Sequence, residues 1–504
     1  MQFVGLFAAT EGWTSLWLTS IWLVGLGALL GLAVSLVLWG VIWLVRPSLG
    51  RAIPAIMTEG AMAPIMGLVV AVAVFGILGA FVARDRDDLL RSLARFPFVG
   101  PRTVQLQVPA ASDAVGKPTP VGLSFRPEEF QGIRVRSAEP LRIFSTPNEL
   151  GESRVSWDVE TGDEFRWQRG LDIPSPFVGI EQPELFVENL GGKAAAATVT
   201  VVAQPKFPQV NSVVVTAVSV VALLGVYLAV TVFFPKVAAV GLATAKSEMA
   251  QPLFLILMIL GVTVLFIMYY IPYHTFGEDI KVLKDTGFTL ILVFGILQSV
   301  WSASNSVSDE VEGRTALTVL SKPIGRSQFI FGKFFGITCV VAVLFVVLGF
   351  WFLLQVSRKP IYDARESSKL APTWVECQME MSTAVPGLAL AFLESVLFIA
   401  ISIAISTRLP LLANFVICFA IYALGHLTPL IVQSSLGRFN IVLFLGQLIA
   451  TIFPVLDHFN IQAAVSAGVG VPYPYLAMAT LYCLIYTGIA MCLALFLFED
   501  RDLA

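Results

Sequence analysis

Residues 334–357 read FFGITCVVAVLFVVLGFWFLLQVS and contain no Asp, Glu, Lys or Arg. A helix that crosses a bilayer needs about 20 predominantly apolar residues, so this stretch predicts a membrane-spanning helix. Of the 504 residues, 57% are apolar and only 13% are charged, whereas an ordinary soluble domain has about 25% charged residues. We therefore expect a polytopic helical membrane protein. The net charge of −3 gives no basic surface for nucleic acid.

Eight further stretches meet the same criterion, so about nine membrane-spanning helices are expected. They are residues 12–45, 60–83, 207–235, 249–277, 286–308, 381–407, 409–437 and 459–498. The stretch 381–407 is interrupted only by Glu394. Residues 439–456 are shorter and contain Gln447, and we interpret them as a re-entrant or interfacial helix, with a full span as the alternative.

The distribution of positive charge predicts the topology. Arg46 and Arg51 are the first basic residues and follow the first span, which puts that loop in the cytoplasm and the N-terminus outside. The segment after the second span then lies outside the cytoplasm. Four arginines at its start run against the positive-inside rule, but three aspartates are interleaved with them, and long translocated domains follow the rule poorly.

Residues 84–209 have a different composition from the rest of the chain. They hold 15 Lys or Arg and 17 Asp or Glu, close to half of all charged residues. Short alternating stretches separated by Pro, Gly and Asn predict an all-β, sandwich-like domain with Trp157 and Trp167 in its core. The expected strands are 104–108, 121–125, 133–135, 141–145, 155–159, 185–187 and 197–202. Residues 188–192, ENLGG, predict a tight hairpin turn.

Two proline pairs suggest an internal repeat. Pro47 and Pro64 have the same spacing as Pro235 and Pro252, and each pair joins the end of one span to the start of the next. We interpret both segments as interfacial elbow helices on the inner face, with coincidence as the alternative. The expected regions are an N-terminal two-span region with a cytoplasmic elbow (1–83), an extracytoplasmic β domain (84–208), a third span (209–234) and a six-span core (235–504).

The loop between the fifth and sixth spans carries the most specific pattern. It begins SDEVEGRTALTVLSKPIGR at Ser308, with acidic residues first and basic residues later, as the helix dipole favours. Pro323 and Gly325 then predict a sharp corner before the next helix, and Lys333 is expected to extend to the inner headgroups. The pattern is E-x-E-G-x-T, L-x-x-P-x-x-R and G-K, formed by Glu310, Glu312, Gly313, Thr315, Leu320, Pro323, Arg326, Gly332 and Lys333.

This pattern resembles the type-2 ABC exporter permeases, in particular the branch associated with maturation of multicopper enzymes such as nitrous-oxide reductase. The resemblance covers roughly residues 235–504 and leaves the first 234 residues outside it. It implies a permease in the bacterial inner membrane with a cytoplasmic C-terminus, and a coupling helix at 309–320 that docks on a separate ATPase. The implied coupling residues are Glu310, Glu312, Gly313, Arg314, Thr315, Leu320, Lys322, Pro323, Arg326 and Lys333.

The sequence has no GxxxxGK[ST] motif for binding nucleotide phosphates. We therefore expect that the chain is not itself an enzyme, has no cofactor, and relies on a P-loop ATPase partner that binds the ATP. One six-span set per chain implies two permease copies, as a homodimer or a heterodimer. The scattered cysteines and three histidines predict no metal site.

Glu394 and His426 are the candidate residues of a transport path, because ionisable side chains inside spans are costly and are functional candidates by default. The alternative is that each is a structural residue, with Gln298 or Asn305 as partners of Glu394. Two other functions remain open. One is an ion-coupled secondary transporter, and the other is a membrane-anchored binding or sensor protein whose outer domain meets a substrate or an envelope partner.

Overall fold

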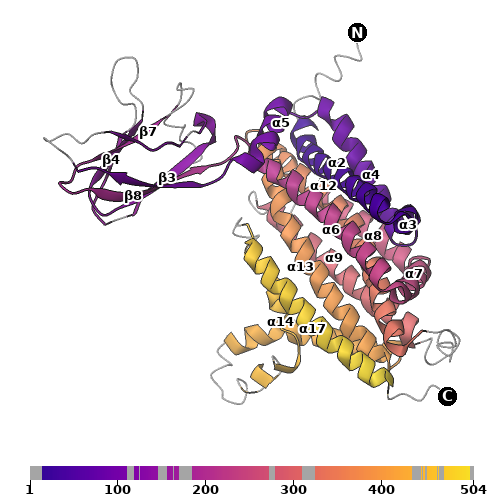
Figure 1. The fold of residues 1–504 in the computed structure, drawn as a ribbon. Helices are drawn as coiled ribbons and strands as arrows, with labels where there is room; N and C mark the ends of the chain where they lie inside the picture. The colour runs from indigo at the N-terminus through magenta and orange to yellow at the C-terminus, as the bar shows by residue number, and fades with distance from the viewer. Residues whose placement is uncertain are drawn as a thin grey trace, which may run out of the picture. The chain divides into compact units, whose positions relative to one another are not determined.

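The computed structural model describes residues 14–110, 118–123, 125–145, 156–162, 164–169, 177, 184–271, 278–308, 324–433, 444, 446–448, 451–461, 464 and 470–499. The chain divides into two compact units (Figure 1). The helical unit comprises Met1–Arg84 and Ser212–Ala504, and the β unit comprises Asp85–Asn211. The two units are described separately below.

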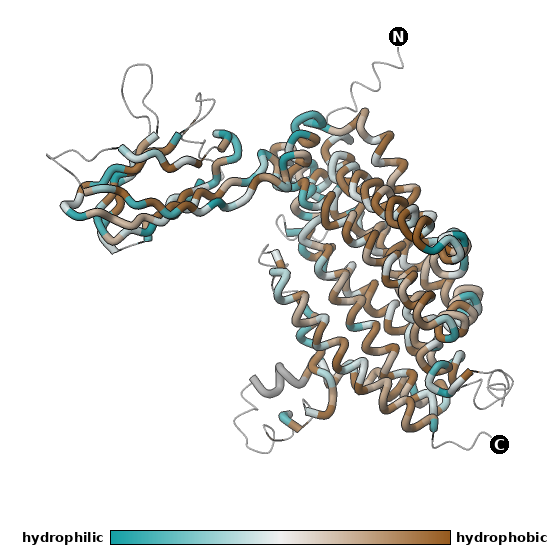
Figure 2. The backbone as a smooth tube through the Cα atoms, in the orientation of Figure 1, coloured by the Kyte–Doolittle hydropathy of each residue, from teal (hydrophilic) through white to brown (hydrophobic). Residues whose placement is uncertain are grey.

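The helical unit consists of long, apolar helices packed side by side (Figures 1 and 2). Its main helices are α2 (Thr14–Val45), α3 (Pro47–Thr58), α4 (Met62–Leu78), α6 (Asn211–Phe233), α7 (Pro235–Met249), α8 (Pro252–Tyr270), α9 (Asp279–Ala303), α12 (Arg326–Glu366), α13 (Trp374–Ser406), α14 (Leu411–Gln433) and α17 (Tyr473–Glu499). Short segments are η1 (Gly79–Phe81), η5 (Ser304–Ser308, a π-helix) and η7 (Leu456–Phe459).

Seven helices within the described residues are long and apolar enough to cross a membrane. They include α2, α8, α12, α13 and α17, together with α4 extended to Phe81 and α6 extended back to Pro208. The expected fifth and eighth spans correspond to α9 and α14, which are not among the seven, so the count of nine spans is not confirmed. Residues 439–443, 445, 449 and 450 of the expected re-entrant helix lie outside the described residues.

Helix α12 is central to the packing of the helical unit. It contacts α7, α8, α9, α13 and α17, and its uncharged middle contributes Val340, Leu344 and Leu348 to the main hydrophobic core. The helix continues past this stretch through Pro360 to Glu366, so its charged ends extend beyond the length that a span needs. The basic residues Arg326 and Lys359 therefore lie near opposite ends of one α-helix.

Glycines bring α7 and α12 into close contact. A Cβ added to Gly332 would lie 2.5 Å from the Cβ of Val240, and one added to Gly336 would lie 2.5 Å from the carbonyl oxygen of Gly241. Small residues let the two helix backbones approach closely. In lipid there is no hydrophobic driving force between helices, so the van der Waals contacts of this close packing stabilise the pair. The glycine of the G-K motif therefore has a packing role.

We expect Gly336→Ala to lower the stability of the helical unit by about 1–3 kcal/mol, because the new methyl group must displace the α7 backbone. Gly488→Ala in α17 is the matched control, since no neighbouring atom lies within 4 Å of its added Cβ, and it should be neutral or slightly stabilising. Thermal unfolding in detergent measures both. Equal melting temperatures for the two variants would contradict the close α7–α12 contact.

The two elbow segments form helices in the structure. Helices α3 and α7 begin at Pro47 and Pro235, because proline at the first helical position costs no hydrogen bond. The acid that follows α3, Glu59, lies 3.5 Å from the Lys246 ammonium in α7. The repeated segments therefore contact each other.

The β unit is a sandwich of two four-stranded antiparallel sheets. Their strand orders are β1-β8-β3-β6 and β2-β7-β4-β5. The strands are β1 (Arg102–Val108), β2 (Thr119–Pro120), β3 (Phe130–Ser137), β4 (Leu141–Ser145), β5 (Ser156–Val159), β6 (Glu164–Gln168), β7 (Leu185–Asn189) and β8 (Ala195–Ala203). Helix α5 (Arg86–Arg95) and the 3-10 turns η2 (Phe96–Phe98), η3 (Pro127–Glu129) and η4 (Pro208–Val210) complete the unit.

Both sheets contribute alternate residues to one core. Val135 in β3 pairs with Val199 in β8, and Ile143 in β4 pairs with Val187 in β7. These four residues are fully buried in the same cluster. Trp157 and Trp167 are half-buried and pack against this core, with Trp167 stacked on Phe130 at 5.5 Å.

Three details of the β unit differ from the sequence prediction. The second strand is Thr119–Pro120 and not residues 121–125, and the edge strand β6 was not predicted. The turn after β7 is present, because the Asn189 side chain accepts the Gly191 N–H and donates to the Lys193 carbonyl. It is not a hairpin turn, because β7 and β8 belong to different sheets.

Helix α5 accounts for the interleaved charges that follow the second span. Its first turn holds Asp87 and Asp88 and its last turn holds Arg95, which suits the helix dipole. Lys206 donates to Asp88 at 2.8 Å, and this hydrogen bond, reinforced by the lysine charge, lowers the pKa of Asp88. Three of the four arginines, Arg86, Arg91 and Arg95, therefore belong to a folded helix of the β unit, whereas Arg84 belongs to the helical unit.

Candidate functional site

The predicted coupling residues fall into two groups. Those of residues 309–323 lie outside the described residues: Glu310, Glu312, Gly313, Arg314, Thr315, Leu320, Lys322 and Pro323. Arg326 and Lys333 are described and lie in the first two turns of α12. The structure also describes both flanks of the segment, which are η5 before it and Ile324 with Gly325 after it.

Arg326 fixes the start of α12 to the end of α17. Its Nη1 donates to the carbonyl oxygen of Glu499 at 2.6 Å, and a cation is favourable at this helix C-terminus. One turn further along, Phe329 stacks on Phe498 with ring centroids 5.7 Å apart. Gly325 caps α12 by donating its N–H to the Gln328 side chain. Movement of the 309–323 segment would therefore be passed to α17 as well as to α12.

Lys333 differs from its expected role. Its side chain is only 4% exposed, and its ammonium lies 5.3 Å from the centre of the Phe329 ring. Buried on the packed face of α12, it does not extend to the surface. Lys333 thus supports the packing at the start of α12.

Glu394 and His426 are brought together. His426 Nε2 lies 3.1 Å from Glu394 Oε1, which joins the middle of α13 to α14. Glu394 is 2% exposed, whereas the His426 side chain is 25% exposed. The partners proposed from sequence are engaged elsewhere, since Gln298 donates to Ser302 and Asn305 donates to Gln251.

Asn414 is the centre of a second buried polar group. Its amide nitrogen lies within 2.8 Å of the hydroxyl oxygens of Ser304, Ser402 and Ser406, and all four residues are fully buried. Ser304 begins the π-helix η5, immediately before the 309–323 segment. A π-helix inserts an extra residue into an α-helix and is frequent at functional sites. The polar group therefore connects η5 to α13 and α14.

Two buried ionic contacts were not predicted from the sequence. One is a cluster at the opposite end of α12, and the other is an ion pair between α9 and α13. Lys359 is fully buried and lies 3.2 Å from Asp363 and 3.9 Å from Asp279. The Tyr362 ring centre lies 4.5 Å from its ammonium. Lys284, also buried, pairs with Glu380 of α13. The sequence prediction assigned these residues no role, and the i, i+4 spacing of Lys359 and Asp363 was the available signal.

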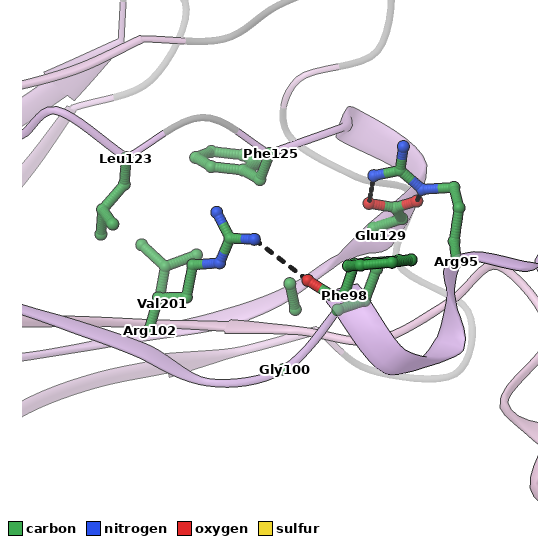
Figure 3. Close-up of a pocket in the computed structure, with 10 residues that line it drawn as sticks. Arg95, Phe98, Gly100, Arg102, Leu123, Phe125, Glu129 and Val201 are labelled. Atoms are coloured by element: carbon green, nitrogen blue, oxygen red, sulfur yellow. Dashed lines mark hydrogen bonds and ion pairs between the residues drawn. The ribbon is translucent and has the colours of Figure 1, made fainter.

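A pocket in the β unit is lined by residues of η2 and of strands β1 and β8, which belong to the same sheet (Figure 3). Its lining includes apolar side chains such as Phe125 and three charged residues. Arg95 Nη2 donates to Glu129 Oε2 at 2.8 Å, and Arg102 donates to the carbonyl oxygen of Phe98 (Figure 3). These bonds are internal to the β unit and hold η2 in place, so the pocket has a structural explanation.

No protein-family model matches the sequence, and a search of curated proteins finds no match. Within the described residues there is also no group of three or more His, Cys, Asp or Glu that could hold a metal ion. The functional argument therefore depends on the flanks of residues 309–323 and on the buried polar side chains of the helical unit.

Proposed function

We propose that this chain is the permease subunit of an ATP-binding-cassette transporter, an exporter driven by a separate ATPase that docks on residues 307–333. The sequence pattern of this segment carries the resemblance to type-2 exporter permeases. In this proposal the chain lies in a bacterial cytoplasmic membrane, with the N-terminus and the β unit outside and the C-terminus in the cytoplasm. The substrate stays open.

The anchoring of the segment is the observation that supports this function best. Arg326 bonds the end of α17, and Ser304 bonds Asn414 of α14. Helices α9 and α12 also pack directly on each other. A partner that pushed on the segment would thus shift four helices together. Helix shifts driven from an interface are an established route for switching between states.

Co-purification tests the proposal. A tag after Ala504, mild solubilisation from the native host and mass spectrometry should identify a stoichiometric P-loop ATPase. Glu310→Gln combined with Glu312→Gln should reduce its recovery about tenfold or more, because charged groups at an interface contribute several kcal/mol when lost together. Arg326 is not substituted, because loss of its hydrogen bond to Glu499 would also disturb the packing of α12 on α17, and the result would not report on docking alone.

Glu366→Gln combined with Glu376→Gln is the matched control, because both acids are exposed and lie at the other end of α12 and at the start of α13. The control should retain the ATPase. Equal recovery from the Glu310/Glu312 variant would contradict docking at this segment. A chain that purifies alone and moves ions in liposomes without ATP would instead support an ion-coupled secondary transporter, the alternative that the Glu394–His426 pair favours.

A further inference from the structure

Helices α13 and α14 face each other along a column of matched side chains. Glu394 meets His426, Phe398 lies 6.0 Å from the Tyr422 ring, and Ser402 and Ser406 meet Asn414. The contact residues of α13 follow one another at intervals of four in rising number. Their partners in α14 fall in number by four or eight, as expected for antiparallel neighbours. The register between the helices is therefore fixed at both ends by polar contacts.

The two ends of this column differ in chemistry. The Asn414 end consists of hydroxyl, amide and thiol groups that bond one another, with Cys418 donating to Asn414 Oδ1 at 3.2 Å. The other end holds an acid and an imidazole. Asn414 and His426 are 12 residues apart, so about 18 Å of helix separates the ends. The ionisable pair is thus deep in the helical unit.

Within the part of the chain that the structure describes, few charged side chains lie near the pair. The α9 residues 286–303, the α12 residues 334–357 and the α17 residues 473–498 contain no Asp, Glu, Lys or Arg. Among the described residues, the titratable groups near the pair are Tyr422, whose ring lies 4.7 Å from the imidazole, and Cys483 of α17, which donates to the Leu393 carbonyl. Asp457 and His458 of η7, which also contacts α13, are exposed.

In this setting, the energetic cost of burying the Glu394–His426 pair depends on how many protons the pair carries. With one proton between them, the carboxyl and imidazole are neutral in sum, either as two neutral groups or as an ion pair. Loss of that proton would leave a buried carboxylate without a counter-charge, which is costly in a low dielectric. Any movement that separates α14 from α13 would break the pair, and this costs least when both groups are neutral.

We propose that Glu394 and His426 form an intramembrane proton-binding site, which is loaded through His426 and governs the separation of α13 and α14. Glu394 is too deeply buried for a larger ligand, whereas the partly exposed His426 gives a proton access. A proton added to Nδ1 of His426 allows the Nε2 proton to pass to Glu394 Oε1, so one proton enters in total. This site does not depend on docking of an ATPase.

Infrared difference spectroscopy of the full chain in lipid bilayers tests the site without any transport assay. A protonated carboxyl group has a distinct C=O stretching band, and the spectrum is followed from about pH 5 to about pH 9, the range in which histidine pairs change charge. We expect a titrating band that is absent from Glu394→Gln and retained in Glu376→Gln, an exposed acid on the same helix.

His426→Gln should move the midpoint of this band by at least about one pH unit, which corresponds to a tenfold change in proton affinity. Glu394→Asp keeps an acid, and its shifted band provides the measurement if Glu394→Gln fails to fold. Identical spectra for the wild type and Glu394→Gln would overturn the proposal, as would an unchanged midpoint in His426→Gln. Because no ATPase is present, neither result depends on the proposed exporter function.

Discussion

Phe130→Ala should lower the free energy of unfolding of the β unit by about 3–5 kcal/mol, the range for removing a large buried aromatic side chain. Phe130 is fully buried and is the centre of an aromatic cluster. Its ring lies 4.8 Å from that of Phe177 in an edge-to-face arrangement and 5.5 Å from that of Trp167 in a stacked one. Such pairs add to the energy of apolar burial.

Phe144→Ala is the matched control for this variant. Phe144 is half-buried on β4, between the fully buried Ile143 and Ser145, and stacks on Phe186 of the neighbouring strand. It should cost only about 1 kcal/mol, because a cross-strand aromatic pair contributes roughly 0.2–1 kcal/mol.

Hydrogen exchange followed by mass spectrometry separates the two units in one experiment. Phe130→Ala should increase exchange in residues 130–137 and 195–203, strands β3 and β8, while α12 and α13 keep the protection of the wild type. Similar exchange in the Phe130 and Phe144 variants would show that the aromatic cluster does not stabilise the sandwich.

Most strands of the sandwich could be predicted from the sequence, because buried residues alternate with more exposed residues along β4, β7 and β8. Residues 141–145 coincide with β4, and β1, β3, β5, β7 and β8 overlap the other predicted strands. The edge strand β6 was missed because half-buried Phe165 and Trp167 alternate with charged residues over only five positions. Turn chemistry at Asn189 predicted a reversal, but whether the next strand stays in the same sheet depends on core packing.

The helical unit was predictable from apolar runs, but its polar contacts were not. Glu394 and His426 were each singled out as ionisable residues inside spans, and neither was assigned to the other. Their separation of 32 residues gives no local signal. The pairing depends on the antiparallel register of α13 and α14, which the short connection between Ser406 and Leu411 allows but does not specify.

The end of α12 could not be predicted from hydropathy. The sixth predicted span ends at Ser357, and Pro360, a residue that usually breaks a helix, follows shortly. The helix nevertheless continues to Glu366. Lys359 and Asp363 consequently lie on the same helix face, and α9 supplies Asp279 as the third member of the cluster.

Lys359→Met should lower the stability of the helical unit by about 3–5 kcal/mol, because it removes the lysine charge from a buried ionic cluster. The lysine is fully buried, and its ammonium also donates to the Tyr269 carbonyl at 3.4 Å. Methionine has a similar length, so lost packing contributes little. The expected cost arises at Asp279 and Asp363, which both lose the positive charge of Lys359.

Two further variants separate charge from packing. Adding Asp279→Asn and Asp363→Asn to Lys359→Met removes the uncompensated charges and should recover most of the lost stability, since a neutral replacement of a buried ion cluster is often tolerated. Lys281→Met is the control on α9, because its pair with Glu278 is exposed and should contribute less than about 1 kcal/mol. Thermal unfolding in detergent ranks all three. If the triple variant were no more stable than Lys359→Met, the lysine would act through its packing and not through its charge. In that case, the ionic contact between α9 and α12 would not stabilise this end of the helical unit.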